Sequence, residues 1–332
     1  MPTIDQFKGI FDFLNRHQVY LEGVKNYYNA DFMRYLRKFR ELLLTLLNRL
    51  DVPHLGELTR LKLRSLLSKV RSATEKTIGA WANGYVKDYR WFVRTDTTIH
   101  KAGFAAKVPT FNCTKTTASQ LWVKVKNAIN PANGKTVSEG AKDVVARAYD
   151  LVQITIKRAS ASARTVAETI AELAANVAEY FKGTALGSLW REAKAFIGSA
   201  FQHATSAVSE ILGSQISECY RYTAIIDNKT SNICRELNGQ IFRYGAGPMP
   251  PQHPNCRSRT IPWLCGNKGD LPLFEDWIAQ QDRDFFNDAY GESYEAAQRA
   301  SKGEVKDYLK SKRVDPLTID AFEAKFPMMV KG

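Results

Sequence analysis

Apolar residues recur at helical spacing through most of the first 214 residues, and this periodicity limits the fold more than any other feature of the chain. In the first segment the pattern is i, i+3, i+4, which places one apolar face along a helix. Its members are Phe7, Ile10, Phe11, Leu14, Phe32, Leu36, Phe39, Leu43, Leu46 and Leu50. With the later segments included, we predict helices at about 6–50, 58–91, 138–182 and 188–212.

Helix-breaking residues separate these segments. Pro53 ends the first helix, because proline lacks the backbone N–H that a helix interior needs. The stretch 95–131 is rich in Thr and Asn and contains Gly103 and Pro109, so we expect an irregular or weakly β arm there. The apolar face of the last helix repeats close to every 3.5 residues, which predicts packing against another helix of the same chain or of a second subunit.

The residue composition and pattern of the sequence change after Gln215. Aromatic and β-branched residues from Cys219 predict a strand, and a short helix follows through Cys234 and Leu237. A second strand is expected at 240–244 and a third at 257–263, with a Gly/Pro-rich loop between them. A chain of 332 residues exceeds what a single core usually supports. We therefore predict a mainly α protein with an α+β C-terminal part: a helical, basic domain at 1–214 and a small mixed domain at 215–332.

Basic charge is concentrated in one fifth of the chain. The formal net charge is +13, and the stretch from Arg60 to Lys126 holds 14 Lys or Arg against three acids. Such a surface suits phosphate contact, although a solvated or partner-facing surface is the alternative reading. The interleaved aromatic residues recur at helical spacing and are expected to pack in a core. The candidate contacts to double-stranded DNA are Arg60, Lys62, Arg64, Lys69, Arg71, Lys87, Arg90 and Arg94.

Several classes of protein are disfavoured. The N-terminal residues lack the pattern of a secretory leader, and no apolar run approaches the length that spans a bilayer, so we expect synthesis in the cytoplasm and no membrane partner. Five cysteines are too few for a disulfide framework, and an odd number leaves at least one thiol free.

One ordered set of motifs points to a protein family more specifically than the composition of the chain does. It comprises RYTAIID at 221–227, TSNIC at 230–234, LNG at 237–239, GP at 247–248 and PPQHPNCR at 250–257. FEDWI at 274–278, QQ at 280–281, Gly291 and DPLTID at 315–320 follow. Together these motifs resemble the phage Mu protein F-like family of head morphogenesis proteins, over about residues 215–328.

The resemblance implies a minor capsid protein of a tailed bacteriophage, present in few copies per particle. It implies a virion location in the head interior near the portal vertex, with the portal protein or the capsid interior as partner. It also implies a role in DNA packaging or ejection, with non-specific DNA binding. An architectural role of this kind needs no catalytic residues, so we expect no enzymatic activity.

Cys234, His253 and Cys256 form the candidate Cys/His cluster. His253 and Cys256 have the spacing of half a zinc knuckle, but relatives carry a Cys-x-x-Cys pair where this chain has Ser231 and Cys234. A fourth zinc ligand would have to come from Cys219, Cys265, Asp227 or water. Packed free thiols with a hydrogen-bonded histidine, or a disulfide between Cys234 and Cys256, are the alternatives. Asp227 and Arg257 can form a structural ion pair or remain separate surface charges.

The second functional hypothesis is a metal-dependent nucleic-acid-processing enzyme that uses the Cys/His cluster. Such an enzyme needs further histidines or acids near the metal to activate water. The other four histidines, His17, His54, His100 and His203, are scattered through the helical half, which disfavours this hypothesis.

Overall fold

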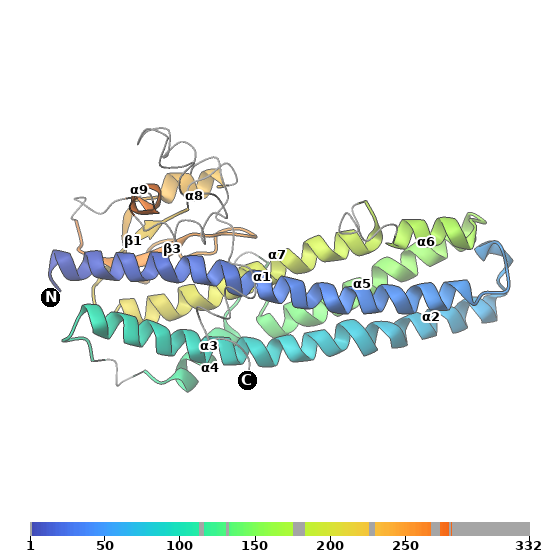
Figure 1. Ribbon diagram of the computed structural model, residues 1–332, viewed down its shortest axis with the longest axis horizontal. Coiled ribbons are helices and arrows are strands. Elements are labelled where there is room, and N and C mark those ends of the chain that lie inside the picture. Colours follow the sequence, from blue (N-terminus) through green and yellow to red (C-terminus); the bar gives the residue numbers. More distant parts are fainter. Residues whose placement is uncertain are drawn as a thin grey trace. The chain divides into compact units, whose positions relative to one another are not determined.

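The computed structural model describes residues 2–112, 116–130, 133–174, 183–225, 230–266, 273–278 and 280. The longer helices are α1 (Ile4–Asn48), α2 (Arg60–Thr74), α3 (Ala80–Lys107), α4 (Ala118–Asn127), α5 (Val137–Ala161), α6 (Val166–Ala174) and α7 (Ala185–Gly213) (Figure 1). The C-terminal part contains β1 (Cys219–Thr223), α8 (Asn232–Leu237), β2 (Ile241–Arg243), β3 (Arg259–Trp263) and α9 (Phe274–Ile278). A 3-10 turn, η1 (Leu55–Glu57), and a π-helical turn, η2 (Glu75–Gly79), complete the described elements.

The chain forms two compact units, each built from separate stretches of sequence. Unit 1 comprises Met1–Tyr27, Arg90–Gly134 and Gly198–Gly332, and unit 2 comprises Tyr28–Tyr89 and Lys135–Ile197. The boundary expected at residues 214 and 215 therefore falls inside unit 1. The reason is that the last turns of α7 pack against the C-terminal sheet, where Ser209 Oγ donates to the carbonyl of Thr260 at 3.3 Å.

The stretch 95–131 is helical over much of its length, so the expectation of an irregular or β arm is wrong. α3 continues to Lys107, and its threonines are accommodated because the hydroxyls of Thr97 and Thr98 donate to carbonyls one turn earlier. Gly103 does not break the helix. A Cβ at Gly103 would lie 2.3 Å from the ring of Phe13, so this glycine permits close packing.

The predicted helix at 138–182 is divided. α5 begins after Thr136, whose side chain forms a capping box with Glu139, and it ends at Ala161. Ala163 has a positive φ of 49°, which ends the helical geometry before α6 begins at Val166. The last part of the predicted helix, 175–182, lies outside the described residues.

Unit 2 has an aromatic core. The rings of Phe32 and Trp81 lie 4.6 Å apart, and Trp81 stacks on Tyr85 at 5.2 Å. Both of these α3 residues are almost fully buried, together with Tyr89. These three aromatic residues, which alternate with basic ones in the sequence, are thus packing residues, as expected, and are not available to stack on bases.

Unit 1 contains a three-stranded antiparallel sheet in the order β2-β1-β3. β1 pairs with β3 over its full length, from Cys219 opposite Trp263 to Thr223 opposite Arg259. Every residue of β3 is buried, including the charged Arg259. The fold class predicted from the sequence, mainly α with a C-terminal α+β part, is confirmed. Among the described residues, no helix combines the length and the apolarity that crossing a bilayer requires.

Candidate functional site

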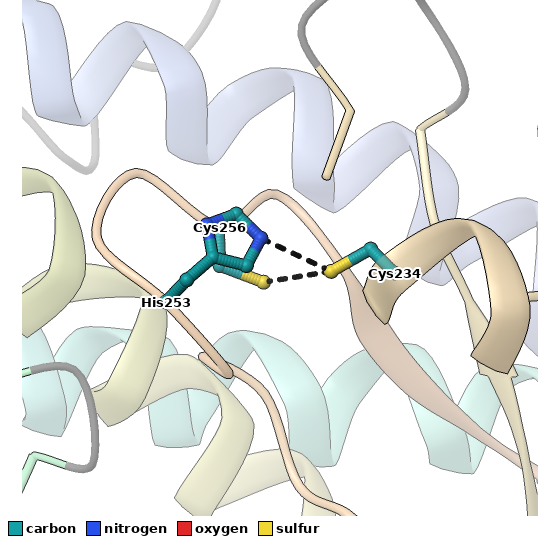
Figure 2. A group of neighbouring side chains, drawn as sticks. All are labelled: Cys234, His253 and Cys256. Carbon is teal, nitrogen blue, oxygen red and sulfur yellow. Dashed lines mark hydrogen bonds between the residues drawn. The ribbon is translucent and has the colours of Figure 1, made fainter. Parts of the chain in front are cut away.

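The three residues of the Cys/His cluster meet in space. Cys234 lies in the first turn of α8, where its backbone N–H is capped by the side chain of Ser231. His253 and Cys256 come from the loop before β3, and both reach toward the Cys234 sulfur (Figure 2). The Cys234 Sγ lies 3.2 Å from His253 Nε2 and 3.7 Å from Cys256 Sγ. Both sulfurs are buried, whereas His253 is partly exposed.

Close packing around the Gly/Pro-rich loop positions His253 and Cys256. Tyr220 donates its hydroxyl hydrogen to the carbonyl of Pro248 at 2.9 Å. A Cβ at Gly247 would lie 2.3 Å from Cβ of Phe242, so only glycine lets the loop approach the sheet here. The backbone N–H of Asn255 donates to Ser199 of α7 at 3.3 Å, which fixes the end of the loop.

The two thiols of the cluster differ in acidity. The hydrogen bond with Cys256 and burial raise the pKa of Cys234 to about 12. The hydrogen bond from Cys234 lowers the pKa of Cys256 to about 6, and backbone N–H groups of Ser258 and Gln252 act in the same direction. Cys256 therefore loses its proton more readily than Cys234, and it is the cysteine of the pair that forms a thiolate more easily.

The structure changes the set of candidate fourth ligands. Cys219 and Cys265 form a disulfide, with their Cα atoms 5.3 Å apart, so neither thiolate is available to a metal. Cys234 and Cys256 are not bonded to each other, because their sulfurs are 3.7 Å apart. Asp227 lies outside the described residues, so its pairing with the buried Arg257 stays a prediction.

A second polar cluster surrounds the charged residue of β3, and the sequence did not indicate it. Arg259 donates to the carbonyl of Leu14 and, at 3.4 Å, to Nδ1 of His17. Since a guanidinium can only donate, Nδ1 of His17 accepts and its Nε2 carries the proton. That Nε2 lies 2.7 Å from the Asp96 carboxylate, so a neutral histidine links Arg259 to Asp96.

His100 completes the second cluster. Its Nδ1 donates to the carbonyl of Asp96 at 2.9 Å and lies 3.4 Å from the carboxylate. Burial lowers the pKa of His100 to about 3 and raises that of Asp96. Burial also lowers the pKa of Arg259, to about 9, although Asp96 opposes this shift. Because Asp96 and His100 are fully buried, this cluster is shielded from any large substrate.

A third set of buried polar side chains contacts Ser258, the residue before Arg259. Gln202 of α7 donates to the carbonyl of Ser258 at 2.7 Å and accepts from the ammonium of Lys25 at 2.7 Å. Lys25 also pairs with Glu22 at 2.7 Å, and burial nevertheless lowers the pKa of this lysine. The start of β3 is thus held to α1, α3 and α7 through polar side chains of unit 1.

The eight candidate DNA-contacting residues are all exposed. None takes part in the ion pairs found among the described residues. Two of them lie over aromatic rings, Arg71 over Tyr149 at 4.4 Å and Arg90 over Trp122 at 5.7 Å. α2 carries five of the eight (Arg60, Lys62, Arg64, Lys69 and Arg71) and contains no acidic residue.

These observations define a class of protein: a mainly helical chain whose small antiparallel sheet is braced by a Cys/His cluster and by buried polar networks. Residues 124–261 match the family described as Phage Mu protein F like protein. Over this stretch the chain is similar to phage Mu protein F-like proteins, which confirms the resemblance seen in the motifs. Neither a curated protein nor a solved structure matches the chain.

The matched stretch differs in extent from the motif-based expectation of 215–328. It begins within α4, includes α5 to α7, and ends within β3 at residue 261. The similarity thus extends into the helical part before Gln215, where the sequence motifs indicated nothing. It includes all three residues of the Cys/His cluster and leaves out the motifs from residue 274 onward.

Proposed function

We propose that this chain is a minor structural protein of a tailed bacteriophage head, located in the head interior near the portal vertex in few copies. The observation that carries the proposal is the match to the phage Mu protein F-like family over the sheet and the Cys/His cluster. The buried polar groups support an architectural role, because they fix the sheet to the helices. Head assembly, through contact with the portal protein or the capsid interior, is the role proposed.

Asymmetric cryo-EM of purified heads tests the proposed location. We expect density for the helices of this chain on the inner side of the capsid, beside the portal, because the proposal requires contact with that vertex. Heads from a mutant phage that lacks the chain are the control and should lose that density alone. Density on the outer surface of the capsid, or purified heads without the chain, would contradict the proposal.

We further propose that the exposed basic residues of α2 bind the genome through its phosphates, without reading sequence. Arg60 and Lys62 lie in the first turn of α2, where positive charge is unfavourable beside the helix dipole. A nearby polyanion compensates that cost. Binding of this kind releases counterions, so its affinity falls steeply with salt.

Reversal of the charge on α2 is expected to weaken DNA binding. The variant replaces Lys62, Arg64, Lys69 and Arg71 with Glu, all at exposed positions. Binding to two unrelated duplexes should weaken at least about tenfold, and the slope of log affinity against log salt should decrease by about three to four. Fluorescence anisotropy over a salt series measures both quantities.

A variant with the same change in net charge provides the control. It reverses four other exposed basic residues outside α2: Arg37, Lys142, Lys157 and Arg191. A smaller loss of affinity in this control than in the α2 variant supports the assignment. Equal losses would mean that net charge alone matters, and a wild-type affinity that is independent of salt would refute phosphate contact.

A further inference from the structure

We propose that Cys234, His253 and Cys256 bind one zinc ion, with a water molecule in the fourth position. The ion would hold the loop before β3 against α8. This inference is independent of the head location and of DNA binding, and goes beyond both. It rests on the geometry of the three side chains in Figure 2.

The distance between the two sulfurs fits a shared metal. A disulfide would require an S–S distance of about 2.05 Å, far shorter than the 3.7 Å between Cys234 and Cys256. Two thiolates at about 2.3 Å from a tetrahedral zinc ion lie about 3.8 Å apart. The His253 Nε2 is 3.2 Å from the Cys234 sulfur, so its ring must retreat by only a few tenths of an ångström on binding.

The imidazole of His253 is held in the form that binds metal. Its Nδ1 lies 2.9 Å from the carbonyl oxygen of Pro254, and since a carbonyl can only accept, Nδ1 carries the proton. In the neutral ring Nε2 then keeps its lone pair, and it points toward the sulfur of Cys234. Histidines that bind zinc usually donate their second N–H in this way, which fixes the tautomer and the ring orientation.

The ligand types and the surroundings select zinc and leave room for water. Two thiolates and an imidazole are soft to borderline ligands, which zinc binds well. Magnesium and calcium bind oxygen ligands instead. Of the described residues, only these three offer a His, Cys or carboxylate atom at this cluster. His253 is partly exposed, so solvent can reach the fourth position.

A metal would add an anchor that the backbone of the loop cannot supply. Four of its residues are prolines, Pro248, Pro250, Pro251 and Pro254, and none of them can donate a backbone hydrogen bond. A metal shared between Cys234 of α8 and the end of the loop would link two segments about 20 residues apart in sequence and place β3 beside β1. Zinc binding would then contribute directly to the folding of this region.

Metal analysis of the full chain, purified under reducing conditions with zinc in the medium, tests the proposal. We expect one zinc per chain by mass spectrometry of the metal. X-ray absorption at the zinc edge should show two sulfur neighbours at about 2.3 Å and two nitrogen or oxygen neighbours at about 2.0 to 2.1 Å. The variant Cys256→Ser should lose the zinc, and the control Cys219→Ser/Cys265→Ser, which removes only the disulfide, should keep it.

A second measurement does not depend on the folding of a variant. Titration of the wild-type chain with an organomercurial thiol reagent should release one zinc per chain, detected with a chromogenic chelator. Wild-type protein without zinc after zinc supplementation would overturn the proposal. A bond between Cys234 and Cys256 in freshly reduced, refolded protein, identified by mass spectrometry of the cross-linked peptide that contains both residues, would also overturn it. Zinc retained by Cys234→Ser/Cys256→Ser would overturn it too.

Discussion

Replacement of Arg259 with Met should lower the free energy of unfolding by about 3 to 5 kcal/mol, because it leaves the buried carboxylate of Asp96 without its compensating charge. Arg259 is fully buried in β3, and neutral His17 links it to Asp96. Methionine fills a similar volume, so the loss reports the charge and the hydrogen bonds rather than a cavity. Urea denaturation followed by circular dichroism measures the change.

The matched control for this prediction removes both charges. In the double variant Arg259→Met/Asp96→Asn, no charge remains unpaired, so the loss should be clearly smaller than in Arg259→Met alone. Asn at position 96 can still accept from Thr205, which donates to Asp96 at 3.3 Å. Equal losses in the single and double variants would show that the two charges do not interact.

A fall in pH from 7 to 5 should also destabilise the folded chain by several kcal/mol, through its buried neutral histidines. Burial lowers the pKa of His100 from its ordinary value of 6.5 to about 3. Burial also lowers the pKa of His203 to about 4 and that of His17 well below its ordinary value. The unfolded chain therefore binds protons below pH 6.5 that the folded chain does not bind.

The sign of the effect follows from this difference in proton binding. The contribution of each histidine is fully present above pH 6.5 and is lost as pH falls toward the folded pKa, by about 1.4 kcal/mol per pH unit. His100 alone thus accounts for about 2 kcal/mol at pH 5. Asp96 and Arg259 are the charged groups that face it, and between pH 7 and 5 Arg259 stays protonated.

The variant His100→Asn isolates the contribution of His100. The measured quantity is the change in the free energy of unfolding between pH 7 and pH 5, so a difference in stability at pH 7 alone does not affect it. We expect the variant to lose about 2 kcal/mol less than the wild type over that range. Titrating groups that do not contact His100 cancel in the comparison. A wild type equally stable at both pH values, or a variant that loses as much as the wild type, would rule out this assignment.

Sequence periodicity predicted the helices and the three strands because each signal is local. The apolar positions Phe7, Leu14 and Phe32 are all buried, as a helical face requires. The error at 95–131 has a local cause too. Threonine lowers the intrinsic helix propensity, but at positions 97 and 98 its hydroxyl donates to a carbonyl one turn earlier, which satisfies the side chain within the helix.

The buried networks could not be predicted in the same way. His17 and Asp96 lie on α1 and α3 and meet only through tertiary packing; the sequence offers only the i, i+4 spacing of Asp96 and His100 as a hint. The disulfide between Cys219 and Cys265 depends likewise on the register of β1 and β3, which places Cys219 opposite Trp263. The spacing of His253 and Cys256, by contrast, is local, and it did point to the Cys/His cluster.

The contact of Arg259 with the carbonyl of Leu14 sets an order for folding during synthesis. The two residues are 245 positions apart, and Trp277 donates to Asp12 across 265 positions. Contacts of such long range close large loops and form late. The contacts of α1 with β3 and α9 can therefore form only after residues 259 and 277 have been made. Its packing against α3, where Phe13 meets Gly103, can form much earlier in synthesis.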